Sequence, residues 1–232
     1  MAQIRQGYYD IETKKAGRGI FKPHKLFDED LGYQTVPYNE ALAYMISDLF
    51  IFDLVPETVL TKVKIGEEVM EGSVQTYVEG VPLDLYLRDN SLPRNEVIEE
   101  QFSKLIVFDT FIANIDRTLG NIIYDQERQR IWAIDNGYSL GFNITSEWEK
   151  RGKEWDYPPM DIHNAKINYP DLIHEYADGE KMEEYAHIVK RRRFQKTEEE
   201  FYPTEEMTDE VYSIINYRQE YLARLVWQQG GN

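Results

Sequence analysis

The sequence contains no cysteine, and this absence removes several kinds of chemistry at once. Without thiols the chain forms no disulfide, no thiolate nucleophile, no cysteine-ligated zinc site and no palmitoyl anchor. Its four histidines show no spacing typical of a zinc ligand set. The first ten residues, MAQIRQGYYD, contain no apolar stretch of the secretory type. We therefore expect a cytoplasmic protein.

Long apolar runs and positive charge are also scarce. Asp and Ser interrupt the most apolar stretches, near residues 41–55 and 105–115, so neither approaches the roughly 18 residues that span a bilayer. The chain carries 42 Asp and Glu against 26 Lys and Arg, a net charge of −16 at pH 7. Nucleic acids and anionic membranes repel such a chain at long range. We expect no direct nucleic-acid partner and no stable membrane anchoring.

One basic run, VKRRRFQK at residues 189–196, departs from this acidic character. It is interpreted as a solvated helix face, with a contact to phosphate or to an acidic partner as the alternative.

The composition is otherwise that of a globular protein, with 42% hydrophobic and 13% aromatic residues. The first half is predicted to be rich in strands. QGYYDIE and IFKP are predicted as strands around the turn KKAGRG, and VPETVLTKVKI and SVQTYVEG as strands around the acidic turn GEEVMEG. Between these pairs, apolar residues at helical spacing predict a helix that Asn39 caps, with Glu40 in its first turn.

The second half is predicted to be mainly helical. VPLDLYLRD is predicted as a short helix and PRNEVIEEQFSKLIVFDTFIANI as a long one, and a last helix is predicted from about Asp209 to Gln228. NIIYD and IWAID are predicted as two strands of a hairpin, joined by QERQR. We place the boundary between the halves near residues 80–84, which gives an N-lobe of residues 1–81 and a C-lobe of residues 82–232.

The strongest chemical signal is the run FIANIDRTLGNIIYD at residues 111–125, followed by AIDNG at residues 133–137. Asp116 and Asn121 are separated by one tight turn, and the predicted hairpin brings Asp135 back beside Asn121. Carboxylate and amide oxygens that converge in this way are ligands for a divalent cation. Within the turn, Gly120 is expected to allow a close approach of the backbone.

Phosphoryl transfer from ATP needs two further groups, a lysine against the phosphates and a glutamate on a helix that fixes it. Lys22 in IFKP and Glu40 in the following helix fit these roles. Simpler interpretations stay open. Asp116 could cap a turn and pair with Arg117, Asp135 could belong to an ordinary hairpin, Lys22 could be a surface residue, and Glu40 could be a first-turn charge.

The run DTFIANIDRTLGN with the later AIDNG resembles the catalytic segment of the phosphatidylinositol 3- and 4-kinase superfamily, which includes the type II phosphatidylinositol 4-kinases and the HipA-like bacterial kinases. IFKP, NEALAYMISDLFIFDLVPET and GSVQTYVEG are similar to the phosphate-lysine strand, the following helix and the strand before the hinge of the type II enzymes. The resemblance covers roughly residues 17 to 160. It implies an α+β, two-lobed protein-kinase-like fold with a β-rich N-lobe and a mainly helical C-lobe.

The resemblance also implies roles for individual residues. Asp116 would be the catalytic aspartate, Asn121 and Asp135 would bind Mg²⁺, and Lys22 would contact the phosphates of ATP with Glu40 as its ion-pair partner. The backbone around four residues would hold the adenine: Thr76, Tyr77, Val78 and Glu79. Asp109 and Asn114 are interpreted as structural residues that order the catalytic loop.

Two positions depart from the family pattern. Thr118 stands where many relatives carry histidine, which bears on rate and acceptor, and the glycine-rich loop is only AGRG at residues 16–19. We expect ATP and Mg²⁺ as cofactors and a Ser or Thr hydroxyl of a protein as the acceptor. The alternatives are a phosphoinositide or small-molecule kinase, nucleotidyl transfer, and a nucleotide-binding pseudokinase or scaffold.

Overall fold

The computed structural model describes residues 3–5, 8–13, 17–24, 36–114, 117–140, 171–192, 209, 212–213, 215–216 and 218–220. Strands come first and most helices later, as the sequence predicts. The elements, in chain order, are β1 (Gln3–Arg5), β2 (Tyr8–Thr13), β3 (Gly17–Pro23), α1 (Val36–Leu49), β4 (Thr58–Ile65), β5 (Glu68–Thr76), β6 (Val81–Pro82), α2 (Leu83–Tyr86), α3 (Glu96–Ile112), the 3-10 turn η4 (Leu119–Asn121), β7 (Ile122–Asp125), β8 (Arg130–Ala133), α5 (Asp171–Tyr176) and α6 (Gly179–Arg191).

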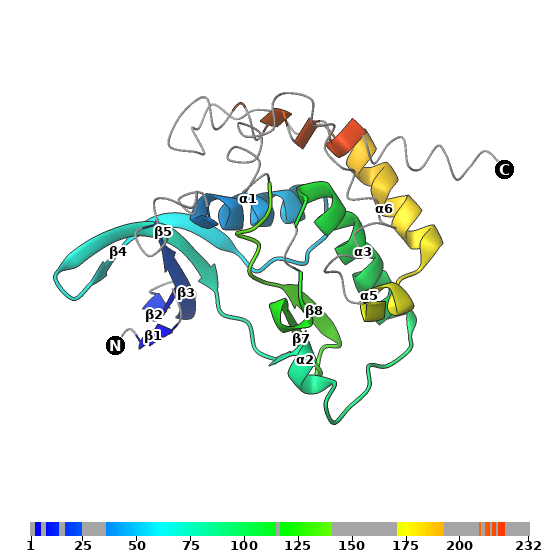
Figure 1. Ribbon diagram of the computed structural model, residues 1–232, viewed down its shortest axis with the longest axis horizontal. Helices are drawn as coiled ribbons and strands as arrows, with labels where there is room; N and C mark the ends of the chain where they lie inside the picture. The colour runs from blue at the N-terminus through cyan, green and yellow to red at the C-terminus, as the bar shows by residue number, and fades with distance from the viewer. Residues whose placement is uncertain are drawn as a thin grey trace, which may run out of the picture.

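The first half forms a five-stranded antiparallel sheet of order β1-β2-β3-β5-β4. Its β4–β5 hairpin reaches outward from the rest of the molecule (Figure 1). A small apolar cluster of Tyr9, Phe21 and Met70 covers one face of this sheet. Because neighbouring residues of a strand point to opposite faces, Lys22 projects from the other face.

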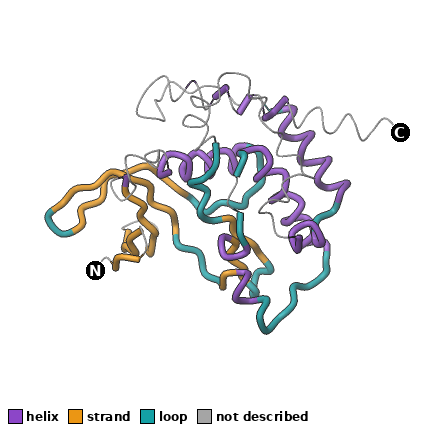
Figure 2. The backbone as a smooth tube through the Cα atoms, viewed as in Figure 1, coloured by secondary structure: helices purple, strands orange, loops and turns teal. Residues whose placement is uncertain are grey.

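The main hydrophobic core lies on the helical side of the molecule, where α3, α5 and α6 gather (Figure 2). Helix α1 contacts β4 and β5 and also buries Ala43 and Ile46 in that core. Just after α1, Phe50 packs edge-on against Phe111 of α3, with the ring centroids 5.0 Å apart. Helix α1 is therefore attached to both the sheet and the helical half. Among the described residues, no helix is both long and apolar enough to cross a bilayer.

Helix α3 has clear signals at both of its ends. The side chain of Asn95 accepts a hydrogen bond from the N–H of Ile98 at 3.0 Å, which is N-cap geometry. At the other end Ala113 adopts a left-handed conformation with φ of 52°, and its N–H bonds back to the last turn. The long helix predicted from the sequence is thus confirmed, and it ends just before the motif at residues 117–140.

The predicted hairpin of the second half is also confirmed. Strands β7 and β8 pair antiparallel from Ile122 opposite Ala133 to Asp125 opposite Arg130, and β6 adds a third strand. The Asp125 carboxylate accepts hydrogen bonds from the backbone and side chain of Arg128 at 3.1 and 2.7 Å. This ion pair closes the turn of the hairpin. The other end of the hairpin, at Ile122 and Ala133, adjoins the motif.

The prediction that Asn39 caps the first helix is wrong. Helix α1 begins at Val36, with Pro37 in its first turn where a missing N–H is tolerated, so Asn39 lies within the helix. The Asn39 side chain instead donates hydrogen bonds to the carbonyls of Gly137 and Ser139, both at 2.9 Å. These two hydrogen bonds connect helix α1 to the segment that follows Asp135.

Two details of the predicted turns also differ. Only Gly66 and Glu67 separate β4 from β5, so most of GEEVMEG belongs to the strands. Gly66 has a φ of 62°, which suits a tight two-residue turn. Gly120 has an ordinary φ, and a Cβ placed there would lie 3.6 Å from Thr118 Oγ1, so no close approach requires glycine. Of the last predicted helix, the described positions between 209 and 220 are helical.

A glycine in β5 tests how closely the strands approach beside Lys22. A Cβ on Gly72 would lie 2.2 Å from the carbonyl oxygen of Lys22 and 2.7 Å from Cα of Pro23. Because both obstacles are backbone, we predict that Gly72→Ala lowers the free energy of unfolding by about 1–3 kcal/mol. Gly179→Ala is the matched control, since no atom lies within 4 Å of its Cβ position. Equal midpoints for the two variants in urea unfolding would contradict the prediction.

Candidate functional site

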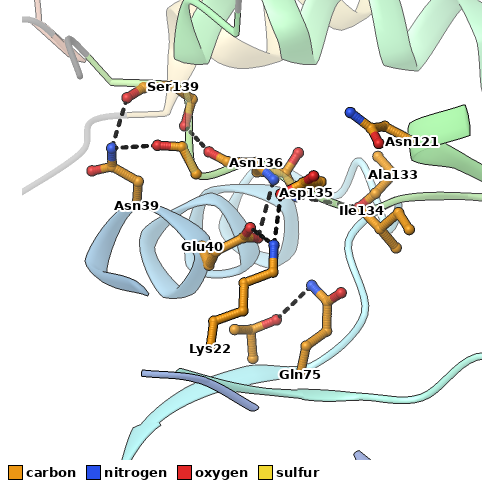
Figure 3. A network of polar contacts seen from close by, with 12 residues as sticks. Lys22, Asn39, Glu40, Gln75, Asn121, Ala133, Ile134, Asp135, Asn136 and Ser139 are labelled. Atoms are coloured by element: carbon orange, nitrogen blue, oxygen red, sulfur yellow. Dashed lines mark hydrogen bonds and ion pairs between the residues drawn. The ribbon is translucent and has the colours of Figure 1, made fainter. Parts of the chain in front are cut away.

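The site centres on Lys22, whose ammonium joins three segments that are far apart in the chain. Its Nζ contacts Glu40 Oε1 of α1 and lies 2.7 Å from Asp135 Oδ1, two residues beyond β8 (Figure 3). The ion pair with Glu40 is the one that the family resemblance implies. The Lys22 side chain is 14% exposed, so it is not the surface lysine of the simpler interpretation.

The two carboxylates hold Lys22 in its charged form. Burial acts to lower the pKa of Lys22, but the negative charges of Glu40 and Asp135 outweigh it and raise that pKa above its ordinary value. A positive charge therefore lies near the C-terminal end of β3, facing the segment that follows the hairpin.

Glu40 is the buried member of this group. It is 1% exposed, which excludes its interpretation as a solvated first-turn charge. One oxygen contacts Lys22, and Oε2 accepts a hydrogen bond from the N–H of Asn136 at 3.1 Å. Burial raises the pKa of Glu40, against the opposing charge of Lys22. Both of its oxygens are used, so its position is fixed from both sides.

Asp135 is the more open member of the group. Its side chain is 43% exposed, and its backbone is left-handed with φ of 57°, a conformation that aspartate tolerates better than most residues. The charge of Lys22 lowers the pKa of Asp135, against the effect of burial. Asp135 lies outside the hairpin turn at residues 126–129, so ordinary hairpin chemistry does not explain it. Its carboxylate is therefore charged and accessible.

A buried arginine supports this arrangement from behind. Arg117 is 1% exposed, and its Nε and Nη2 bind the two oxygens of Asp109 at 3.0 Å each. Its remaining N–H groups bind the carbonyls of Asn121 and Ile134 at 3.0 and 2.6 Å and Asn136 Oδ1 at 2.6 Å. All five N–H groups of the guanidinium have partners. Arg117 thus fastens the residue before β7 and the residue after β8 to α3.

The segment after Asp135 is fixed by side-chain amides. Asn136 is fully buried, and its Nδ2 donates to the carbonyl of Ala133 at 3.2 Å. A Cβ on Gly137 would lie 2.4 Å from Cγ1 of Val36, so the chain passes against the first turn of α1. Together with the two hydrogen bonds from Asn39, these contacts fix the backbone of the segment that follows Asp135.

Asn121 lies opposite this segment, as the hairpin prediction requires. Its carbonyl accepts a hydrogen bond from the N–H of Ile134 at 3.0 Å, which places it one register step from Asp135. Among the described residues, no three His, Cys, Asp or Glu side chains gather into a metal-binding cluster. An amide and a carboxylate oxygen do fit Mg²⁺, which takes one or two protein oxygens and completes its shell with phosphate and water.

The remaining predicted residues have mixed outcomes. Asp116, the predicted catalytic residue, lies outside the described residues, as does Ala16 of the AGRG loop. Thr118 is exposed beside Arg117. The side chain of Asp84 in α2 lies 3.7 Å from the Cβ position of Gly120, so α2 borders the same loop.

The predicted hinge at residues 76–79 connects the two halves, and its first amides are already used. The N–H of Thr76 bonds to Glu57 O at 2.8 Å, and the N–H of Tyr77 bonds to Arg18 O at 3.0 Å. The Arg18 guanidinium also covers the Tyr77 ring at 3.7 Å. Within the described residues the N–H of Val78 has no such partner. If a base binds here, Val78 is the backbone donor that it meets.

The chain is similar to known kinases in sequence and in fold. No model of a known protein family matches the chain. Phosphatidylinositol 4-kinase type 2-beta of Gallus gallus is 26% identical over 190 residues, covering 60% of this chain and 40% of the relative. The Xenopus tropicalis protein of the same name is 27% identical over 199 residues, covering 62% and 40%. The chain thus spans about 40% of the length of these curated relatives.

The fold also matches a solved kinase structure. The Helicobacter pylori proinflammatory kinase CtkA superposes with a TM-score of 0.56 at 13% identity, covering 97% of this chain and 94% of that one. In sequence the chain is similar to phosphatidylinositol 4-kinases, and in fold it is similar to a kinase. The expected kinase-like fold is thereby confirmed, and the roles of the individual site residues stay predictions.

Several site residues escaped prediction from the sequence. The sequence indicates Arg117 only as a partner of Asp116 and Asn39 only as a helix cap, and it predicts no side-chain role for Asn136. Each of the three residues is buried and polar. Each makes at least one hydrogen bond to a residue that is 19 or more positions away in the chain. The available signal was a set of polar residues inside apolar segments, which a single sequence does not connect to partners.

The buried ion pair of Arg117 generates a stability prediction. Arg117→Met keeps much of the side-chain volume but leaves the Asp109 carboxylate buried without its cation. We predict a loss of about 3–5 kcal/mol in the free energy of unfolding. Arg128→Met, which removes an exposed arginine from its pair with Asp125, is the control and should cost at most about 1 kcal/mol. Similar losses for the two variants in chemical denaturation would contradict the assignment.

The Lys22–Asp135 pair generates a pH prediction. The pKa of Asp135 is lower in the folded chain than in the unfolded chain, so the pair stabilises the fold above the ordinary aspartate pKa of about 4 and is lost as the pH falls below it. Asp135→Asn keeps a residue that tolerates the left-handed backbone. We predict that wild type exceeds Asp135→Asn in unfolding free energy at pH 7 and that the difference shrinks toward pH 3. The surface variant Asp89→Asn is the control. A difference independent of pH would contradict the pairing.

Proposed function

We propose that the chain is an ATP-dependent kinase that transfers the γ-phosphoryl group to a hydroxyl, with Ser or Thr of a protein as the acceptor. The observation that carries the proposal is the Lys22 ammonium, which Glu40 fixes from one side and which borders the accessible carboxylate of Asp135. This is the arrangement needed to hold polyphosphate beside a divalent cation.

Lys22 provides positive charge at the place where phosphate charge must be neutralised. Glu40 stays bound to both Lys22 and the Asn136 N–H, so the ammonium keeps its place when Asp135 is no longer its partner. Asp135 and Asn121 would hold Mg²⁺, which supplies charge neutralisation across the phosphates. The rigid contacts around Arg117 and Asn136 keep these side chains in position without reorganisation, which favours transfer.

Asp116 is proposed to orient the acceptor hydroxyl and to accept its proton. This role rests on the DRTLGN motif, in which Asp116 precedes Arg117. Val78 at the hinge would bind the base through its N–H, between the sheet and the helical half.

A protein acceptor fits the charge of the chain better than a lipid acceptor. A net charge of −16 opposes approach to an anionic bilayer, and without cysteine the chain has no site for a palmitoyl anchor. A phosphoinositide acceptor is the second candidate, because the curated relatives are named phosphatidylinositol 4-kinases. A pseudokinase that binds nucleotide without turnover is the candidate from another class, and Thr118 is the residue that favours it.

Phosphate transfer from labelled ATP with Mg²⁺ tests the proposal. We predict that wild type labels itself or proteins of a mixed extract, and that Asp116→Ala and Asp135→Ala lower the rate by at least about 100-fold. Asp89→Ala, a change of an exposed surface aspartate, should leave the rate unchanged.

Parallel reactions with phosphatidylinositol vesicles decide between the acceptors. Labelled lipid without labelled protein would favour the lipid candidate. If wild type binds nucleotide but labels neither acceptor and does not hydrolyse ATP, the chain is a pseudokinase and the proposed activity is wrong.

A further inference from the structure

Gln75 is a nearly buried polar residue that the proposed phosphate chemistry leaves unused. It lies in β5, one residue before the predicted hinge, and is 8% exposed. Lys22 pairs with Ser73 and Ile20 pairs with Gln75, and alternate residues of a strand share a face. Gln75 therefore projects from the sheet on the same side as Lys22, as Figure 3 shows.

The orientation of the Gln75 carboxamide is fixed by a chain of two hydrogen bonds. The hydroxyl of Thr58 has one hydrogen, which it donates to the carbonyl of Pro56 at 2.8 Å. The same hydroxyl can then only accept from Gln75, so the amide atom 3.0 Å away is Nε2. Thr58 is 2% exposed, so water does not compete for these bonds. The carbonyl oxygen Oε1 must face away from Thr58.

The Gln75 carboxamide oxygen is available to accept a hydrogen bond. Within the described part of the chain, Gln75 Oε1 has no hydrogen-bond partner. The atom is not fully buried. Because Oε1 is not fully enclosed, it stays open to a donor from outside the protein. A ligand that binds between the hinge and Lys22 would supply the missing donor.

The purine bases differ in the group that they present at ring position 6. Adenine carries an amino group there, which donates, whereas guanine and hypoxanthine carry a carbonyl oxygen, which only accepts. An oxygen that faces Oε1 would be repelled and would leave both acceptors unpaired. A fixed acceptor beside the hinge therefore discriminates between the two kinds of purine.

We propose that Gln75 Oε1, held in place by Thr58, selects adenine nucleotides by accepting a hydrogen bond from the 6-amino group. The proposal rests on the proposed function, because it places the base at the hinge of the same nucleotide site. It adds a residue that decides which nucleoside triphosphate enters, and it assigns Thr58 as the residue that positions it.

Calorimetric titration with Mg·ADP, Mg·IDP and Mg·GDP tests the selection without turnover. IDP replaces the 6-amino group by an oxygen without the 2-amino group of GDP. Wild type should bind ADP at least about tenfold more tightly than IDP. Gln75→Met should lose about tenfold in ADP affinity and retain its IDP affinity, so the ratio collapses.

The positioning role of Thr58 has its own variants. Thr58→Val removes the hydroxyl, lets the carboxamide rotate to present Nε2, and should improve IDP and GDP binding relative to ADP. Thr58→Ser restores the hydroxyl and should keep the wild-type ratio. Thr61→Val, at an exposed position of the same strand, is the control and should also keep it. Thermal unfolding without ligand confirms that each variant is folded.

The outcomes separate the selection from the proposed function. If wild type binds ADP while Gln75→Met and Thr58→Val keep its ADP-to-IDP ratio within about twofold, the selection is wrong and the kinase proposal stands. If Gln75→Met does not fold, the Thr58→Val and Thr58→Ser pair decides in the same way. If wild type binds none of the three nucleotides, both proposals are wrong.

Discussion

The buried pairing of Arg117 with Asp109 is the constraint on which the rest of the site depends. A guanidinium at 1% exposure is tolerable only when its N–H groups all find acceptors. Here the acceptors come from α3, from the residues that flank the two hairpin strands, and from Asn136. The requirement to satisfy one buried charge therefore fixes the position of several segments at once. Asn136 connects Arg117 to the ion pairs of Lys22, because its side chain binds Arg117 and its backbone N–H binds Glu40. The ion pairs of Lys22 with Glu40 and Asp135 are thus supported by the buried ion pair of Arg117 with Asp109.

Helix α1 connects the two halves of the molecule through this network. Its apolar side belongs to the main core, its Glu40 binds Lys22 of the sheet, and its Asn39 binds the carbonyls that follow Asp135. A displacement of the sheet relative to the hairpin would have to break a buried ion pair. Lys22 itself has one buried partner, Glu40, and one accessible partner, Asp135. In the proposed function, Glu40 keeps the lysine in place while Asp135 exchanges the lysine for a divalent cation.

Much of this organisation could be predicted from the sequence, for physical reasons that differ between elements. Helix α3 and the β7–β8 hairpin have strong local signals, a cap at Asn95 and two short apolar strands around a polar turn, and both were predicted. The motif residues Lys22, Glu40 and Asp135 were found because phosphoryl transfer restricts the residue types that can serve it. The start of α1 was misplaced because Asn39 has the chemistry of a cap and satisfies distant carbonyls instead. The contacts of Arg117 and Asn136 are not predictable in this way, because they cross the fold and no local pattern encodes them.

The central claim is that Lys22, Glu40, Asp135 and Asn121 form one site for phosphate and a divalent cation. A crystal structure of the chain with Mg·ADP tests it most directly. The account predicts the metal at about 2.1 Å from side-chain oxygens of Asp135 and Asn121. It also predicts Lys22 Nζ against a phosphate oxygen while its contact with Glu40 persists. Nucleotide bound elsewhere, or bound with Lys22 still paired to Asp135 and no metal on that carboxylate, would contradict the claim.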